Sequence, residues 1–501
     1  MTRRSGRTLA VTMVVLLTGM LSNVPAALAI EPPSVDPALV PPDSTPGPEQ
    51  PMRQSNVCAR AITVAEPNVG LPAPGFTMLN VSKAWQYSTG NGVAVAVIDT
   101  GVNPSPRLPV VAGGDYIMGG DGLSDCDAHG TVVASLISAA PSGTPMPAPL
   151  PPRPAFPQPA GIPQAGPTSA PSSSSPLPPP LPAPPIAPDG VAGVAPHATV
   201  ISIRQSSRAF EPQNPGPGDM DARRKAGTVS TLARAIVHAA NLGAKIINVS
   251  VTACVSAADP LDQRAIGAAV WYAATVKDAV VVAAAGNEGE DGCLQNPSFD
   301  PLGAEDPRDW RNTKTVSSPS WFSDYVLSVG AVDTTGAPLS KSLAGPWVAA
   351  AAPGVAIMGL APGGGPANAY PPVRPGDKDI PFWGTSFSAA YVSGVAALVR
   401  AKYPQLSAHQ VIHRILQTAH NPARGIDNQV GYGVVDPVAA LTFDVPAGDR
   451  AVVDAQTRVV TPPQAPPPPD HRARTVAAGF AGVVAAGVLL VGLISRARRA
   501  R

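Results

Sequence analysis

Proline is the feature that most constrains the fold, because it makes up 63 of the 501 residues, or about 13%, against a usual ~5%. A proline inside a helix or a central strand removes a backbone hydrogen bond, so such a load must gather in linkers. Residues 141–188 hold 20 prolines and one charge, Arg153, and residues 461–470 are a second such stretch. We expect the first to be an extended insertion, either a partner-binding or protease-sensitive loop or a solvated spacer, and the second to be a stalk.

The rest of the chain, roughly 81–140 and 189–446, alternates short apolar runs with helical stretches. The apolar runs have the length and the aliphatic content of buried strands: Val93–Ile98, Val200–Ile203, Ile246–Val251, Val280–Ala284 and Val326–Val332. Helical stretches such as Val229–Leu242 and Pro260–Lys277 lie between them. Continuous apolar strands indicate a parallel sheet covered by helices on both faces. Such an α/β fold places its chemistry at the carboxyl ends of the strands.

The charge balance excludes two classes of protein. The net charge is +1 and charged residues are 14% of the chain, so it is neither an acidic disordered protein nor a histone-like binder of nucleic acid. We therefore expect no nucleic-acid partner.

The N-terminus has the three parts of a secretory signal peptide. Arginines at positions 3, 4 and 7 precede the apolar run Leu9–Leu21, and Ala27-Leu28-Ala29 has the small-x-small form of a cleavage site. We predict a signal peptide over residues 1–29; the alternative is an uncleaved N-terminal anchor.

The C-terminus contains a candidate membrane span. Thr475–Ser495 runs 21 residues without a charge, which is long enough to cross about 30 Å of hydrocarbon. Four arginines follow it within residues 496–501, whereas only Arg472 and Arg474 closely precede it. The positive-inside rule then predicts a cytoplasmic C-terminus and a single-pass type I topology with the body outside the cell membrane. A buried core helix is the alternative.

Asp99 ends the first predicted strand, in the triplet Asp-Thr-Gly. Aspartic proteases use the same triplet, but they need two carboxylates that share a proton. This chain has one such triplet, and Asp333-Thr334-Thr335 does not replace a second. We therefore reject that chemistry.

Three further residues follow in motifs that place them at the ends of elements. His129, in His-Gly-Thr, and Ser386, in Gly-Thr-Ser, each open an apolar helix, and Asn287 follows an apolar strand in Ala-Ala-Gly-Asn. Taken alone, the histidine could have a purely structural role, and the serine could simply be the N-cap of its helix. Together with Asp99 they make the set that acyl transfer requires: a nucleophile, a base, a residue that orients the base and an oxyanion donor.

These four motifs, in the order Asp, His, Asn, Ser, resemble those of the subtilisin family of serine proteases, over about residues 81–441 apart from the proline-rich insertion. Ala192–Pro196 and Ile246–Ser250 match its framework as well. With a signal peptide, an N-terminal extension and a membrane anchor, the chain is most similar to the mycosins, the membrane-anchored proteases of type VII secretion systems. The resemblance implies a subtilisin-like three-layer αβα fold with a mostly parallel sheet, plus one C-terminal transmembrane helix.

The resemblance also implies roles for residues. Ser386 would be the nucleophile, His129 the general base and then acid, Asp99 the residue that orients the imidazole, and Asn287 the oxyanion donor. Ser250 and Val251 would lie along the substrate cleft. No metal or cofactor is implied.

Three departures from the family pattern stand out. Ala390 replaces a proline found four residues after the serine in many members, and Val132 replaces a second histidine. Thr252-Ala253 replaces a glycine-rich cleft wall. The specificity of degradative subtilisins therefore does not carry over.

The four cysteines allow three pairings. Cys254 and Cys293 each follow a predicted strand, and those two strands are expected to be parallel neighbours, so we predict a Cys254–Cys293 disulfide. Cys58 then pairs with Cys126, which ties the Pro-rich N-terminal extension to the loop before His129.

These observations predict the following layout: signal peptide 1–29, extension 30–80, peptidase domain 81–446 with the insertion 141–188, linker 447–474, membrane helix 475–495 and tail 496–501. The leading hypothesis is an endopeptidase that cleaves secreted proteins in the cell envelope and supports a type VII secretion membrane complex. The alternative is a mainly structural subunit of that complex; an adhesion protein with an inactive protease fold has little support, because no triad residue is lost.

Overall fold

The computed structural model describes residues 30–143, 147–148, 188–214, 226–258, 262–290, 292–297, 306, 308–423 and 425–452, with a few residues between 486 and 498. The chain divides into two compact units, Met1–Val452 and Val453–Arg501. The expected signal peptide lies outside the described residues, as do most of the Pro-rich insertion, the linker and the apolar C-terminal segment. No helix within the described residues is both long and apolar enough to span a bilayer.

The first unit is built on a seven-stranded sheet in which every neighbouring pair is parallel, in the order β11-β10-β8-β6-β2-β4-β3. The strands are β2 Ala94–Asp99, β3 Val110–Asp115, β4 Thr199–Arg204, β6 Ile246–Val249, β8 Val280–Ala284, β10 Val326–Val332 and β11 Val348–Pro353. The predicted α/β fold with a mostly parallel sheet is therefore confirmed. The expected neighbours β6 and β8 do pair.

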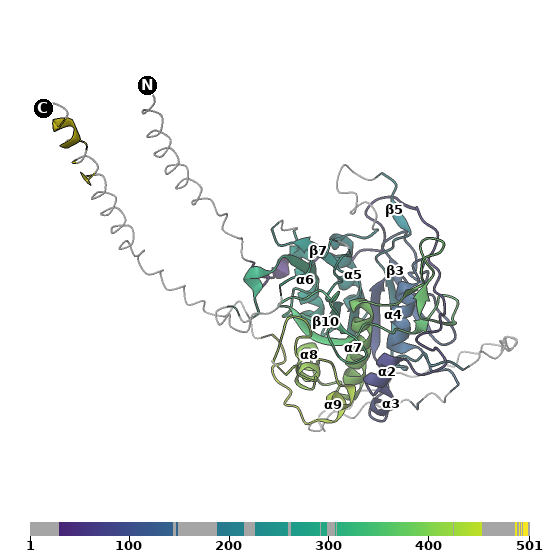
Figure 1. Ribbon diagram of the computed structural model, residues 1–501. Helices are drawn as coiled ribbons and strands as arrows, with labels where there is room; N and C mark the ends of the chain where they lie inside the picture. The colour runs from purple at the N-terminus through teal and green to yellow at the C-terminus, as the bar shows by residue number, and fades with distance from the viewer. Residues whose placement is uncertain are drawn as a thin grey trace, which may run out of the picture. The chain divides into compact units, whose positions relative to one another are not determined.

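Helices cover both faces of this sheet because successive strand side chains point in opposite directions. In β2, Val95 and Val97 belong to one core cluster, and Ala96 and Ile98 to the other. The first cluster is completed by α4 (His129–Ser138) and α7 (Thr385–Lys402), and the second by α5 (Val229–Asn241) and α6 (Arg264–Trp271) (Figure 1). The result is three layers, αβα.

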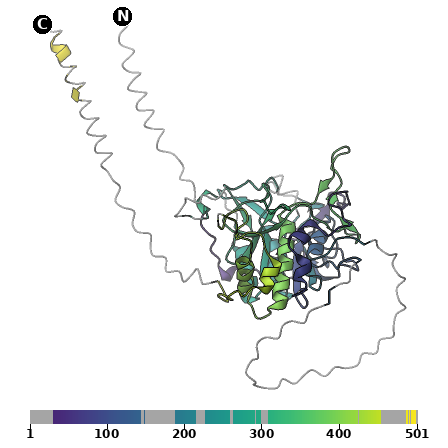
Figure 2. The same ribbon diagram turned by 60° about the horizontal axis from the view of Figure 1, so that its bottom comes forward.

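Two helices beside α7 begin with clear local signals. Figure 2 shows green α7 in its middle, next to α8 (Ala408–Gln417) and α9 (Pro437–Thr442). Ser407 and Gln410 form a capping box at the start of α8. Asp436 caps α9, and Pro437 occupies its first turn. Most of α7 is buried, which explains why its sequence is almost wholly apolar or small.

Two strands of the seven-stranded sheet were not indicated by the sequence pattern. β3 is an edge strand with two glycines and several exposed positions, and β11 is an edge strand made mostly of alanine, which has no β preference. Both form because a neighbouring strand supplies the hydrogen bonds. The expected helix Pro260–Lys277 is shorter: α6 starts at Arg264, and Tyr272–Val276 is a π-helical turn.

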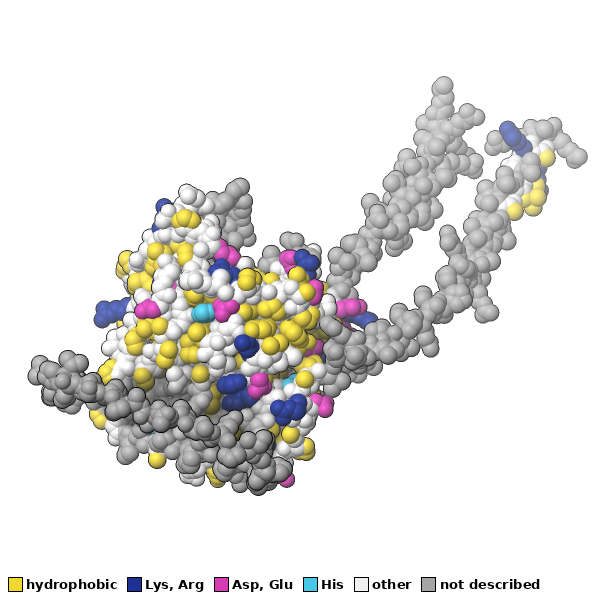
Figure 3. All heavy atoms as spheres, turned by 180° about the vertical axis from the view of Figure 1, so that it is seen from behind, with side chains coloured by type: hydrophobic (Ala, Val, Ile, Leu, Met, Phe, Trp, Pro, Cys, Tyr) yellow, Lys and Arg dark blue, Asp and Glu magenta, His cyan; other side chains and the backbone are white. Residues whose placement is uncertain are grey.

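The N-terminal segment lies along the domain surface with little regular structure. Its short strand β1 (Met52–Gln54) pairs with β5 (Phe210–Pro212), and η1 (Pro37–Leu39) and α2 (Pro74–Met78) are each under two turns long. Asp43 Oδ1 lies 2.8 Å from His238 Nδ1 on α5. On the face drawn in Figure 3, acidic and basic side chains of the described residues are interspersed among hydrophobic ones.

Candidate active site

Asp99 and His129 meet at the carboxyl end of β2. Asp99 is the last residue of that strand and is 1% exposed. His129 is the first residue of α4, and its Nδ1 lies 2.7 Å from Asp99 Oδ1. The same Oδ1 accepts a hydrogen bond from the Thr100 N–H at 2.7 Å. Only glycine fits at position 130, because a Cβ there would collide with the carbonyl oxygen of Gly101 and crowd the Asp99 carboxylate.

The pKa of His129 is raised above the ordinary value of histidine. Burial alone would lower the pKa, but the charge of Asp99 and its hydrogen bond to Nδ1 outweigh burial, with a smaller contribution from Asp125. The carboxylate thus both orients the ring and stabilises its protonated form, as a general base needs during the reaction.

Ser386 lies at the start of α7, and the residue after it packs near the His129 ring. Ser386 is the second residue of the helix and 8% exposed. The ring of the next residue, Phe387, lies 5.2 Å from the His129 ring, centroid to centroid. The N-cap is Gly384, which has no side chain to accept an N–H group of the first helical turn, and the positive end of the helix dipole favours an anion here.

Asn287 follows β8 and lies against the same helix start. Its Oδ1 accepts hydrogen bonds from the Thr385 backbone N–H at 3.0 Å and from the Thr385 hydroxyl at 3.1 Å. Gly384 has a φ of 138°, and a Cβ there would lie 3.2 Å from Asn287 Nδ2. The structure therefore brings all four predicted catalytic residues to one end of the sheet, on elements that the sheet and α7 hold together.

Sequence reasoning missed a second buried carboxylate, Asp125. Its two oxygens accept hydrogen bonds from Thr100 Oγ1 at 2.8 Å and from the Thr131 N–H and hydroxyl at 2.8 and 2.6 Å. Burial raises the pKa of Asp125 to about 6, although these hydrogen bonds oppose the shift. Asp125 thereby links the turn after Asp99 to the first turn of α4. The sequence signal that could have indicated Asp125 is its position four residues before His129.

Comparison with known proteins agrees with this geometry. The model of the subtilase family, Peptidase S8, matches residues 90–433. The chain belongs to the subtilase family. Within it, mycosin-2 of Mycobacterium tuberculosis is 63% identical over 99% of this chain and 98% of its own length. The crystal structure of MycP1 from Mycobacterium smegmatis has a TM-score of 0.72 and 42% identity, and covers 84% of this chain and 97% of that one.

A further structural relative is a chain of the intact ESX-5 inner membrane complex, with a TM-score of 0.71 and 49% identity, covering 93% of this chain and 100% of that one. This subtilase is accordingly a serine protease of the mycosin group, as its motifs predicted.

The predicted cleft residues of this subtilase follow β6. Ser250 is 7% exposed, and its hydroxyl accepts a hydrogen bond from Asn248 Nδ2 at 2.7 Å, while Val251 is partly exposed. After them, β7 (Ala253–Ser256) pairs antiparallel with β9 (Thr315–Ser318). Thr252-Ala253, which replaces the glycine-rich cleft wall of the family, therefore leads into a paired strand. The departure at Ala390 lies fully buried inside α7.

Both disulfides of this subtilase join the cysteines that the strand argument pairs. Cys58 and Cys126 have Cα atoms 4.5 Å apart, and Cys254 and Cys293 have Cα atoms 5.1 Å apart. The first attaches the N-terminal extension three residues before His129. The second attaches β7 to the turn that follows Asn287.

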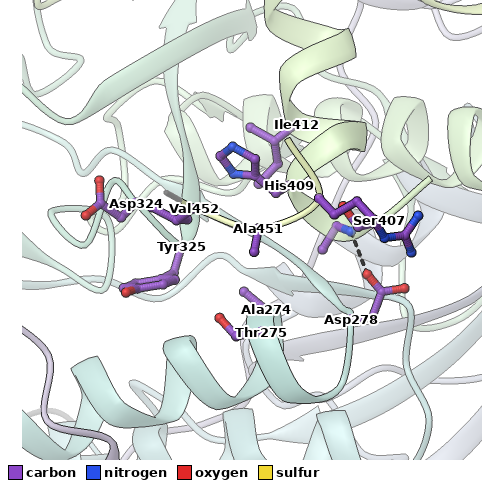
Figure 4. Close-up of a pocket in the computed structure, with 12 residues that line it drawn as sticks. Ala274, Thr275, Asp278, Asp324, Tyr325, Ser407, His409, Ile412, Ala451 and Val452 are labelled. Carbon is purple, nitrogen blue, oxygen red and sulfur yellow. Dashed lines mark hydrogen bonds between the residues drawn. The ribbon is translucent and has the colours of Figure 1, made fainter. Parts of the chain in front are cut away.

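A separate pocket of about 210 Å³ contains none of these residues (Figure 4). It lies between η2 (Tyr272–Val276), α8 and residues 450–452. Burial raises the pKa of Asp324 and lowers that of His409, which both line it. The Asp278 carboxylate accepts a hydrogen bond from the Ala408 N–H at 2.6 Å. The pocket is therefore distinct from the candidate active site.

Proposed function

We propose that the chain is a membrane-anchored endopeptidase that cleaves secreted proteins in the cell envelope. Asp99, His129 and Ser386 form its catalytic triad, and Asn287 donates to the oxyanion. The observation that supports these roles is the 2.7 Å contact between Asp99 and His129, with Ser386 and Asn287 at the adjacent start of α7.

The geometry supports acyl transfer in two halves. Ser386 Oγ attacks the scissile carbonyl carbon while His129 Nε2 takes its proton, and Asp99 holds the Nδ1–H. The oxyanion accepts from Asn287 Nδ2 and from N–H groups at the start of α7. As the tetrahedral intermediate collapses, His129 gives the proton to the leaving amine. Water then repeats the sequence on the acyl-enzyme and releases Ser386.

The substrate would bind in an extended form along Ser250 and Val251. These residues follow the carboxyl end of the central strand β6, and an extended peptide can add to main-chain groups there through hydrogen bonds. This placement is consistent with a protease that selects exposed, unstructured segments of its targets.

The proposed anchoring uses the layout derived from the sequence. Residues 1–29 direct export, 30–80 remain attached to the peptidase domain 81–446, and 447–474 connect that domain to one membrane helix over 475–495 with a cytoplasmic tail. The division of the chain after Val452 and the relatives in ESX inner membrane assemblies support this arrangement. Type VII secretion complex components are then the proposed partners.

A structural role is the second candidate, because one relative is a chain of an intact inner membrane complex. In this case the fold would stabilise the complex, and proteolysis would be secondary. The two roles are compatible.

A Ser386→Ala variant tests the proposal and separates the two roles. We expect it to fold and reach the membrane but to lose cleavage of candidate secreted substrates, which is followed by mass spectrometry of the secreted fraction. Undiminished cleavage would contradict the triad assignment. If secretion stops in a deletion strain but continues in the Ser386→Ala strain, the secretion role is structural; if it stops in both, it requires proteolysis.

A further inference from the structure

The amide that should stabilise the oxyanion is already engaged in this structure. Asn287 Nδ2 donates a hydrogen bond to Glu290 Oε2 at 3.1 Å. Glu290 lies on the turn that follows β8, and its carbonyl oxygen accepts from the Cys293 N–H at 2.8 Å. The Cys254–Cys293 disulfide holds that turn. A carboxylate therefore lies next to the group that a substrate oxyanion requires.

An arginine approaches the same carboxylate from the His129 side. Arg208 lies on the loop after β4, and its backbone N–H donates to Asp127 Oδ1 at 2.7 Å, two residues before His129. Asn56 of the N-terminal extension donates to the Arg208 carbonyl oxygen at 2.9 Å. The positive charge of Arg208 also lowers the pKa of His129, in agreement with a position near the imidazole.

The two side chains meet between these two sides. Arg208 Nη2 lies 3.8 Å from Glu290 Oε2, the same oxygen that accepts from Asn287. Arg208 is hydrogen-bonded to the segment before His129, and Glu290 lies on the turn after Asn287. The ion pair therefore connects the two sides of the candidate active site. The side chains are 69% and 38% exposed, which makes the pair accessible to water and able to open.

We propose that Arg208 and Glu290 form a latch across the active site, which occupies Asn287 in the free enzyme and must open before the oxyanion can form. The inference rests on the proposed roles of Ser386 and Asn287. The oxyanion and the Glu290 carboxylate are both anions that accept from the same amide, so they compete and repel each other.

Active-site labelling with a fluorophosphonate tests the latch directly. Ser386 Oγ bonds to phosphorus, fluoride leaves, His129 takes the hydroxyl proton, and the phosphoryl oxygen must use the oxyanion donors. The full-length protein in detergent is labelled under pseudo-first-order conditions as wild type and as Glu290→Ala, Glu290→Gln and Arg208→Gln variants. Glu288→Gln is the matched control, because it removes a carboxylate from the same turn, exposed and two residues away. Thermal melting shows that each variant is folded.

We expect Glu290→Ala to be labelled roughly three- to tenfold faster than wild type, the range that loss of one exposed ion pair and one charge-assisted hydrogen bond allows. Glu290→Gln should be faster by less, since an amide oxygen still accepts from Asn287. Arg208→Gln should also be faster than wild type, but by less than Glu290→Ala, because the carboxylate loses its counter-ion and can still accept from Asn287. Adding about 0.5 M NaCl should accelerate the wild type and Glu288→Gln but not Glu290→Ala, because salt screens the pair.

The opposite result would overturn the latch. If both Glu290 variants fold but are labelled more slowly, Glu290 orients the second N–H of Asn287 and is a positioning residue. Equal rates for wild type and Glu290→Ala at every salt concentration would also overturn it. Labelling that survives Ser386→Ala would instead overturn the proposed function, and the latch with it.

Discussion

At the scale of single residues, Asn287 is held by both ends of its amide. Thr385 donates to its oxygen, and its nitrogen donates to Glu290. We expect Asn287→Ala to lower kcat about 10²–10³-fold and to leave KM nearly unchanged, because the oxyanion exists only in the transition state. Steady-state kinetics on a peptide substrate measures both constants.

The matched control for Asn287→Ala is Asn296→Ala, which removes the amide of a buried asparagine. Asn296 is 6% exposed and donates to two backbone carbonyls at 2.9 and 2.7 Å, so its loss should lower the melting temperature without a change in kcat. A rise in KM with unchanged kcat in Asn287→Ala would contradict the oxyanion role.

Asp99 should control the acid limb of the pH profile. The active form carries a neutral His129, and Asp99 is the main cause that raises the pKa of the imidazole. In Asp99→Asn the lowering effect of burial dominates, so the pKa of His129 falls and the acid limb of kcat/KM moves to lower pH. The value of kcat should fall by on the order of 10³–10⁴, because the tautomer is no longer fixed.

The pH profile of kcat/KM for wild type and Asp99→Asn checks this prediction. An acid limb that stays in place or moves to higher pH in the variant would mean that Asp99 does not act on His129 as proposed.

At the scale of elements, the Cys58–Cys126 bridge joins a segment with little structure of its own to the loop before α4. It closes 68 residues, so the chain-entropy relation gives about 4 kcal/mol of stabilisation. We expect the Cys58→Ser, Cys126→Ser double variant to melt at a lower temperature and to expose residues 30–60 to limited proteolysis.

Peptide mapping without reduction checks the pairing in the wild type. A peptide that joins Cys58 to Cys254 or to Cys293 would contradict both the pairing and the attached extension. Unchanged melting and unchanged proteolysis in the double variant would mean that the surface contacts, such as Asp43 with His238, hold the extension without the bridge.

At the scale of the whole molecule, the first compact unit ends at Val452. A chain truncated after Val452 should therefore fold, keep its peptidase activity and leave the membrane fraction, since α8 and α9 complete the core before that point. Fractionation and a melting curve compare it with the full chain. Retention of the truncated chain in the membrane fraction would contradict an anchor at residues 475–495.

The sequence by itself determined the fold class and predicted the catalytic set. Five apolar runs indicated a parallel sheet, and the four motifs, each local to a few residues, predicted Asp99, His129, Asn287 and Ser386 as catalytic residues. These features could be read from the chain because strand burial and helix starts have signatures in neighbouring residues. The resemblance to subtilisins rested on the same motifs.

Only the tertiary structure decided which distant side chains meet. The edge strands β3 and β11 contain glycines or alanines that do not favour a strand, and each forms because β4 or β10 supplies its hydrogen bonds. Asp125 joins two catalytic turns through Thr100 and Thr131, and Arg208 reaches Glu290 across 82 positions (290 minus 208). No local pattern marks such pairs, because a contact between polar side chains depends on how the whole chain folds and not on the residues beside each of them.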